Sequence, residues 1–95
     1  MAKLSDAALQ AKVAGLPHWE CRNGALEREF RFRNFVGAIE FVRQTADLAE
    51  QAGHHPDIDI RYNRVRLALV THDEGGITDK DIDMAGRISS LADAQ

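Results

Sequence analysis

The sequence predicts an α+β fold of two layers, in which helices cover one face of a four-stranded antiparallel sheet. Two stretches of alternating apolar and polar residues are each interrupted by a short turn, which is the pattern of a β-hairpin. Three segments with apolar residues at helical spacing lie before, between and after these stretches, leaving little room for parallel crossovers. We therefore expect the order α-β-β-α-β-β-α in a single domain over residues 1–95.

The first helix is predicted to begin after Ser5, whose hydroxyl can cap it, and to end near Gly15. Leu4 and Leu9 have the spacing of a hydrophobic staple across this start. The predicted helix is short.

The first hairpin follows, with strands over residues 18–22 and 25–33 joined by the turn pair Asn23-Gly24. A two-residue loop sets two pairs of residues opposite one another, Cys21 with Leu26 and Trp19 with Arg28. We expect Arg28 to lie across the indole ring, and Cys21 to be a small buried residue rather than a reactive thiol.

A long helix is predicted from Asn34, a suitable N-cap, to Ala52, with Gly53 as its stop. Its apolar residues form two adjacent stripes, Phe35, Ile39, Val42, Ala46 and Ala49 in the first and Ala38, Phe41, Leu48 and Ala52 in the second. A helix on one sheet usually needs only one stripe. We expect the second, with Phe41 and Leu48 outermost, to meet another subunit; the alternative is that the first helix or a loop covers it.

The second hairpin is predicted from alternation over residues 58–62 and 65–70, with a turn around Asn63. The run Glu74-Gly75-Gly76 ends the second strand. Thr78 and Asp81 then have the spacing of a capping box at the start of the last helix. We expect the buried side of that helix to comprise Ile82, Ala85, Ile88 and Leu91 or Ala92.

Composition excludes several classes of protein. Apolar content of 44% and charged content of 28% are ordinary for a globular chain, and no apolar run reaches the ~20 residues that span a bilayer. A net charge of -3 argues against a nucleic-acid binder with a broad basic face. The only cysteine cannot form an internal disulfide, and residues 1–6 lack the apolar region of a secretory signal, so we expect a cytoplasmic location.

Three of the four histidines gather around the second hairpin, as His54, His55 and His72. Pro56 makes the histidine pair the irregular start of a strand, and His72 follows the end of the next strand. These two ends are adjacent in an antiparallel hairpin, so we expect all three imidazoles at one rim of the sheet. Because imidazoles exchange protons near neutral pH, the pattern favours acid/base chemistry on a bound small molecule.

Three other interpretations stay open at this point. Histidines in exposed loops can gather by chance. A metal site of three histidines with Asp73 is a second interpretation, although the adjacent pair would have to splay to share one ion. Nucleophilic catalysis is the weakest, since no Ser or Cys lies in a nucleophile elbow.

The same residues make up a set of motifs: Glu50-x-x-x-His54-His55-Pro56-Asp57, Tyr62-Asn63-x-Val65, Thr71-His72-Asp73, Gly75-Gly76-Ile77-Thr78 and Asp81. With these motifs the sequence resembles the pterin-4a-carbinolamine dehydratase family over nearly the whole chain. Trp19 and Phe30-x-Phe32 also stand in the family's positions. One departure is Ile58, where animal members carry a tryptophan, which puts an aromatic wall for the pterin at that position in doubt.

The resemblance implies a hydro-lyase that dehydrates 4a-hydroxytetrahydropterin to quinonoid dihydropterin and water. Such an enzyme recycles the pterin cofactor of aromatic amino acid hydroxylases and needs no metal or organic cofactor. It further implies His54 and His72 as acid/base groups and His55 as a catalytic-site residue that mainly binds substrate. The residues implied to line the substrate are Pro56, Val70, Thr71 and Asp73.

Two acidic residues are implied to support this site by orienting imidazoles or holding its shape. Asp81 has a simple alternative as a capping-box carboxylate, and Glu50 has one as part of a solvated helix face. The implied partners are a pterin substrate and, as a candidate, an aromatic amino acid hydroxylase, with no nucleic acid and no membrane. We also expect a homo-oligomer, dimer or tetramer. A different function, a non-catalytic dimerisation module for a regulatory protein, has the long helix as its sequence evidence.

Overall fold

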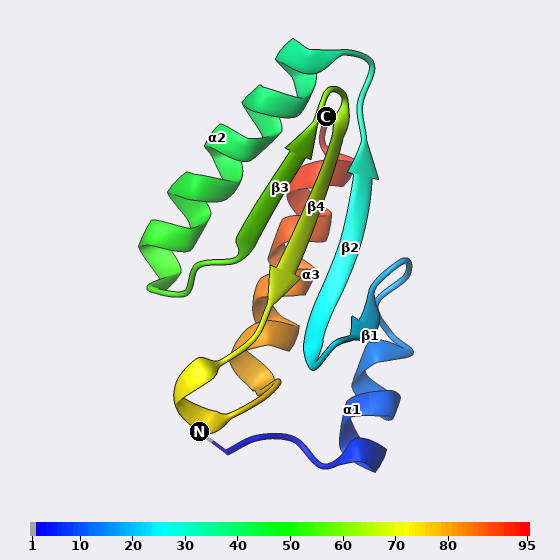
Figure 1. Ribbon diagram of the computed structural model, residues 1–95, viewed down its shortest axis with the longest axis vertical. Coiled ribbons are helices and arrows are strands. Elements are labelled where there is room, and N and C mark those ends of the chain that lie inside the picture. Colours follow the sequence, from blue (N-terminus) through cyan, green and yellow to red (C-terminus); the bar gives the residue numbers. More distant parts are fainter. Residues whose placement is uncertain (1) are drawn as a thin grey trace.

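A computed structural model describes residues 2–95 and confirms the α+β fold with the expected order of elements (Figure 1). The helices are α1 (Asp6–Val13), α2 (Phe35–Ala52) and α3 (Asp79–Asp93). The strands are β1 (Glu20–Arg22), β2 (Ala25–Arg31), β3 (Asp57–Arg61) and β4 (Arg64–Leu69), and a 3₁₀ turn, η1 (His72–Glu74), follows β4.

The four strands form one antiparallel sheet in the order β1-β2-β4-β3. The turn at Asn23-Gly24 sets Cys21 opposite Leu26, as predicted. The second hairpin turns at Tyr62 and Asn63, so β3 is an outer strand whose five residues are all exposed. Because β3 starts where β4 ends, the segment before β3 and the segment after β4 meet at one rim of the sheet.

The helices begin and end where the capping residues predict. Ser5, Asn34 and Thr78 each accept a backbone N–H at the start of a helix, and Thr78 forms a complete capping box with Asp81. Gly53 ends α2 with a φ of 64°, a left-handed conformation that glycine adopts without strain. This stop turns the chain sharply just before His54.

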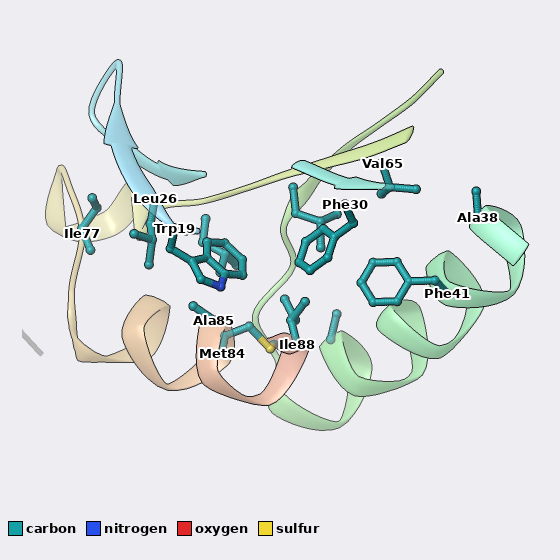
Figure 2. Packing of buried hydrophobic residues seen from close by; sticks show 13 residues of the cluster. Trp19, Leu26, Phe30, Ala38, Phe41, Val65, Ile77, Met84, Ala85 and Ile88 are labelled. Carbon is teal, nitrogen blue, oxygen red and sulfur yellow. The ribbon is translucent and has the colours of Figure 1, made fainter. Parts of the chain in front are cut away.

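A single hydrophobic core lies between the sheet and the helices that cover one of its faces (Figure 2). From the sheet it receives Leu26, Phe30, Val65, Leu67 and Leu69, and from the helices Ala38, Phe41, Ala49, Met84, Ala85 and Ile88. Met84 is a core residue that the sequence pattern of α3 missed, whereas Ile82 is only half-buried. Figure 2 shows the helices that carry Phe41 and Met84 on the same side of the strands, so the side chains of the other face point away from these helices.

The expectation for α2 was wrong about which of its stripes faces outward. Phe41 is fully buried, with its ring centroid 4.8 Å from that of Phe30 and 4.9 Å from that of Phe32. The exposed apolar side chains are instead Phe35, Val36 and Ile39. The three phenylalanines pack against one another across the sheet–helix interface, and this packing turns Phe35 and Ile39 of the first stripe toward solvent, while Ala49 of that stripe stays in the core.

Two details of the first hairpin also differ from expectation. Cys21 is exposed, because β1 is a short outer strand with all three residues exposed. The paired ladder ends at Glu20 and Glu27, so Trp19 lies just outside β1. The guanidinium of Arg28 lies 4.2 Å from the centre of the Phe30 ring rather than across the indole. Arg28 and Trp19 meet instead at Ser89, whose hydroxyl oxygen accepts a hydrogen bond from each.

Candidate functional site

Asp81 is the centre of a buried polar network at the rim where β3 starts and β4 ends. Its side chain has no exposed surface. One carboxylate oxygen accepts hydrogen bonds from the backbone N–H of Thr78 and the hydroxyl of Thr71, each at 2.9 Å. The other oxygen lies 2.5 Å from Nε2 of His54. Asp81 is therefore both a helix cap and the acceptor for a histidine.

His54 is held on two sides. Its backbone N–H donates to the carbonyl of Ala49 in the last turn of α2, which fixes the chain just after Gly53. Its side chain is only 12% exposed and points Nε2 at Asp81. Because a carboxylate acts as an acceptor, Nε2 carries the proton in this pair, and Nδ1 is left as the nitrogen that can exchange one.

Thr71 joins β4 to the network. Its hydroxyl lies 2.8 Å from that of Thr78 and donates to Asp81, and its backbone forms an isolated bridge with Gly76. The bridge closes the loop that contains η1. The network therefore locks together the end of β4, the start of α3 and the segment before β3.

His55 and Glu50 form a second and very different pair. Nε2 of His55 lies 2.5 Å from a carboxylate oxygen of Glu50, and the two side chains are 60% and 77% exposed. A contact between two such exposed side chains contributes little to stability, but it can still bias the direction in which the imidazole points. Glu50 thus contacts His55 and not His54.

The remaining predicted site residues surround the same rim. His72 and Asp73 lie exposed in η1, and within residues 2–95 their side chains make no hydrogen bond or ion pair. Pro56 and Val70 are half-buried at the start of β3 and the end of β4. The structure joins His54, Thr71 and Asp81 directly. That all three imidazoles serve one pocket stays a prediction.

A hollow of about 260 Å³ lies beside His54. Helix α3 contributes four residues to its wall that were not among the predicted site residues: Lys80, Asp83, Met84 and Arg87. These positions follow the helical spacing i, i+3, i+4 and i+7 and so share one face of α3. That spacing is the signal that could have identified them. Gln51 and Ala52 of α2 complete the lining.

Two further observations bear on the class of site. Within residues 2–95, no three His, Cys, Asp or Glu side chains gather in an arrangement that could hold a metal ion. None of the helices in that part of the chain combines the length and hydropathy needed to cross a bilayer. What the rim does offer is a histidine backed by a buried carboxylate, an arrangement suited to proton transfer.

Comparison with known proteins identifies the family. The model of the family described as pterin 4 alpha carbinolamine dehydratase matches residues 2–91. A relative from Acidobacterium capsulatum is 53% identical over 96% of this chain and 99% of its own length. One from Chloroflexus aurantiacus is 54% identical over 96% and 98%, and both are named for the pterin-4-alpha-carbinolamine dehydratases.

A solved structure agrees in fold. The crystal structure of a transcriptional coactivator/pterin dehydratase from Brucella melitensis superposes with a TM-score of 0.91 at 35% identity, covering 95% of this chain and 98% of that one. The chain therefore belongs to the pterin-4a-carbinolamine dehydratase family, a family of hydro-lyases.

Proposed function

We propose that the chain dehydrates a 4a-hydroxytetrahydropterin to a quinonoid dihydropterin and water by histidine acid/base catalysis. The observation that carries the proposal is the His54–Asp81 pair at the rim, in a chain that belongs to this family. A buried carboxylate that accepts from one ring nitrogen stabilises the imidazolium that forms when the other nitrogen takes a proton. His54 is thus prepared for proton transfer before substrate arrives.

The reaction needs one proton donor and one proton acceptor. The C4a–O bond breaks as the donor protonates the leaving hydroxyl, and water departs. The acceptor takes the proton from N5, and the N5–H electron pair forms the new double bond to C4a. A positioned acid/base pair contributes about 10²- to 10⁴-fold in rate. We assign this pair to His54 and His72, without dividing the two roles between them.

The other rim residues bind and position. His55 contacts the substrate, with Glu50 biasing the direction of its ring. Pro56, Val70 and Asp73 line the flat ring of the pterin. Thr71 lines it as well, while its hydroxyl holds Asp81 in place. Asp81 is a positioning residue, because it acts through His54.

The test is stopped-flow measurement of the decay of 4a-carbinolamine absorbance in His54→Ala and His72→Ala. We expect turnover to fall by about 10²-fold or more in each, with circular dichroism unchanged. The matched control is His18→Asn, since His18 has a φ of 72° and asparagine tolerates that conformation. Wild-type turnover in both rim variants would exclude the acid/base assignment.

We also propose that the chain forms a homo-oligomer through the exposed apolar side chains of α2 and β3. Phe35, Val36 and Ile39 of α2, with Ile58 and Ile60 of the outer strand β3, are too exposed for a core role. An uncovered strand edge and an apolar helix face are the usual elements of such an interface. Light scattering of wild type and of Ile39→Lys tests this. A wild-type monomer would contradict it and would favour the alternative of an interaction module for another protein.

The proposed reaction has a place beside aromatic amino acid hydroxylation, which releases the 4a-hydroxytetrahydropterin that this enzyme would consume. An aromatic amino acid hydroxylase is the candidate partner, and the cytoplasm the expected compartment. A coupled assay, in which a hydroxylase consumes limiting pterin, would show faster sustained turnover when this protein is added. If turnover in that assay does not rise, the protein does not have the recycling role, even if the dehydratase activity itself is present.

A further inference from the structure

Three arginines lie side by side in one row across the end of the sheet that is remote from His54. The strand register sets Arg31 of β2 opposite Arg64 of β4, and Arg64 opposite Arg61 of β3. Directly opposed residues of an antiparallel sheet point to the same face. Here it is the face opposite the core, because the residues next to Arg31 and Arg64, Phe30 and Val65, are buried on the other side.

Charge on this face is sorted from one end of the sheet to the other. The next row, Glu29, Arg66 and Asp59, has one net negative charge, and the row after it, Glu20, Glu27, Ala68 and Asp57, has three. Arg66 partly neutralises the acidic side chains of these two rows, because it forms ion pairs with Glu27 and Glu29. Positive charge is therefore concentrated in the end row.

The end row is short of partners. Asp59 binds Nε of Arg61 at 3.1 Å, but within residues 2–95 no ion pair links Arg31 or Arg64 to an acidic side chain. Like charges directly opposite one another on neighbouring strands destabilise a sheet. Folding alone does not account for three of them in register, whereas an anionic ligand would.

The space beside the row is suited to such a ligand. A hollow of about 590 Å³ is lined by Arg31, Arg61, Arg64, Tyr62 and Asn63. Tyr62 is 68% exposed at the hairpin turn, so its ring is accessible to a ligand. Figure 1 shows this turn between β3 and β4 at the opposite end of the sheet from η1 and the segment before β3, so the hollow is separate from the candidate catalytic rim.

We propose that this row binds a small ligand carrying two or three linked phosphoryl groups. Guanidinium groups match phosphate oxygens with paired, charge-assisted hydrogen bonds. Neighbouring strands lie about 4.8 Å apart, so the row spans roughly 10 Å and suits several linked anionic groups better than one carboxylate. A nucleic-acid strand fits less well, because beyond the row it would meet Glu29 and Asp59 on a chain of net charge -3.

Calorimetric titration with sodium tripolyphosphate at about 0.15 M salt tests the proposal, since weak surface attraction is screened there. We expect saturable binding that weakens about tenfold or more in Arg64→Gln and in Arg31→Gln, as loss of a charge-assisted contact predicts. The matched control is Arg22→Gln, which removes the same charge from the far edge strand β1 and should leave affinity unchanged. Dehydratase turnover should be the same in all three variants.

Parallel titrations with adenosine triphosphate and adenosine distinguish two possible ligands, a nucleotide and an inorganic polyphosphate. Tighter binding of the triphosphate than of tripolyphosphate, with the difference lost in Tyr62→Asn, identifies a nucleotide; equal binding identifies an inorganic polyphosphate. Absence of saturable heat, or equal losses in Arg64→Gln and Arg22→Gln, would overturn the proposal. Tighter binding of a short oligodeoxythymidylate than of tripolyphosphate would also overturn it. The same holds if Arg64 instead supports a salt-sensitive dimer and the protein releases no heat with tripolyphosphate.

Discussion

Nε2 of His54 lies 2.5 Å from a carboxylate oxygen of Asp81, although the two residues are 27 positions apart. The pair connects the end of α2 to the start of α3, and the carboxylate also accepts from Thr71 and from the helix N-terminus. One buried group therefore stabilises the last helix, closes the loop after β4 and orients the imidazole. These three roles predict that its replacement affects stability and turnover together.

Replacing Asp81 by asparagine tests this. The amide keeps the shape but has only one acceptor oxygen, so an oxygen placed at the cap turns the NH2 donor toward His54, and Nε2 can then no longer donate. We expect unfolding free energy to fall by about 1–3 kcal/mol and kcat to fall more than KM rises. The ¹⁵N shifts of His54 should show that Nε2 no longer holds a fixed proton. If both the ¹⁵N shifts of His54 and kcat are unchanged, Asp81 acts only as a helix cap.

Two buried threonines predict opposite changes in stability. Among residues 2–95 the Thr45 hydroxyl finds no hydrogen-bond partner, although the residue is only 1% exposed. Thr45→Val removes an unpaired polar group and should raise the free energy of unfolding by up to about 1 kcal/mol. Thr71→Val loses bonds to Asp81 and Thr78 and should lower it by about 1–3 kcal/mol. Urea unfolding at one fixed protein concentration measures both, and a loss in Thr45→Val would contradict the prediction.

The capping residues and turns were predictable because their signals are local. Ser5, Asn34 and Thr78 each precede an apolar pattern at helical spacing, and Asn23-Gly24 fixes a hairpin register by itself. The rim of the sheet could be predicted as well, because antiparallel pairing brings the ends of consecutive strands together whatever else surrounds them.

What sequence could not supply was the rotation of α2 and the choice of partners. Two apolar stripes on one helix are equivalent until the ring of Phe41 is placed against Phe30 and Phe32, and only the packed core decides between them. The same holds for Asp81: the spacing predicts a cap, but its bond to His54 depends on where α2 ends relative to α3. Arg28 faces Phe30 rather than Trp19 for the same reason.

The thiol of Cys21 is expected to react slowly with alkylating reagents. The residue is exposed, yet partial burial raises the pKa of its thiol above the ordinary value. Because the thiolate is the reactive form, a raised pKa leaves less of it at neutral pH. We expect alkylation by iodoacetamide, followed by mass spectrometry, to be slower than that of glutathione in the same tube. The difference should narrow as the pH rises toward the thiol pKa, and equal rates at neutral pH would contradict the assignment.

The corrected orientation of α2 predicts a contrast between Phe41 and Ile39. Phe41 is fully buried between two other aromatic rings, so Phe41→Ala should cost about 3–5 kcal/mol of unfolding free energy through a cavity that cannot close. Ile39 is 40% exposed, and Ile39→Ala should change the stability of a monomer by less than about 0.5 kcal/mol. Urea unfolding over a range of protein concentrations distinguishes the two effects. If the exposed face of α2 is an interface, Ile39→Ala will lower the apparent stability only where wild type is assembled, whereas Phe41→Ala will lower it at every concentration.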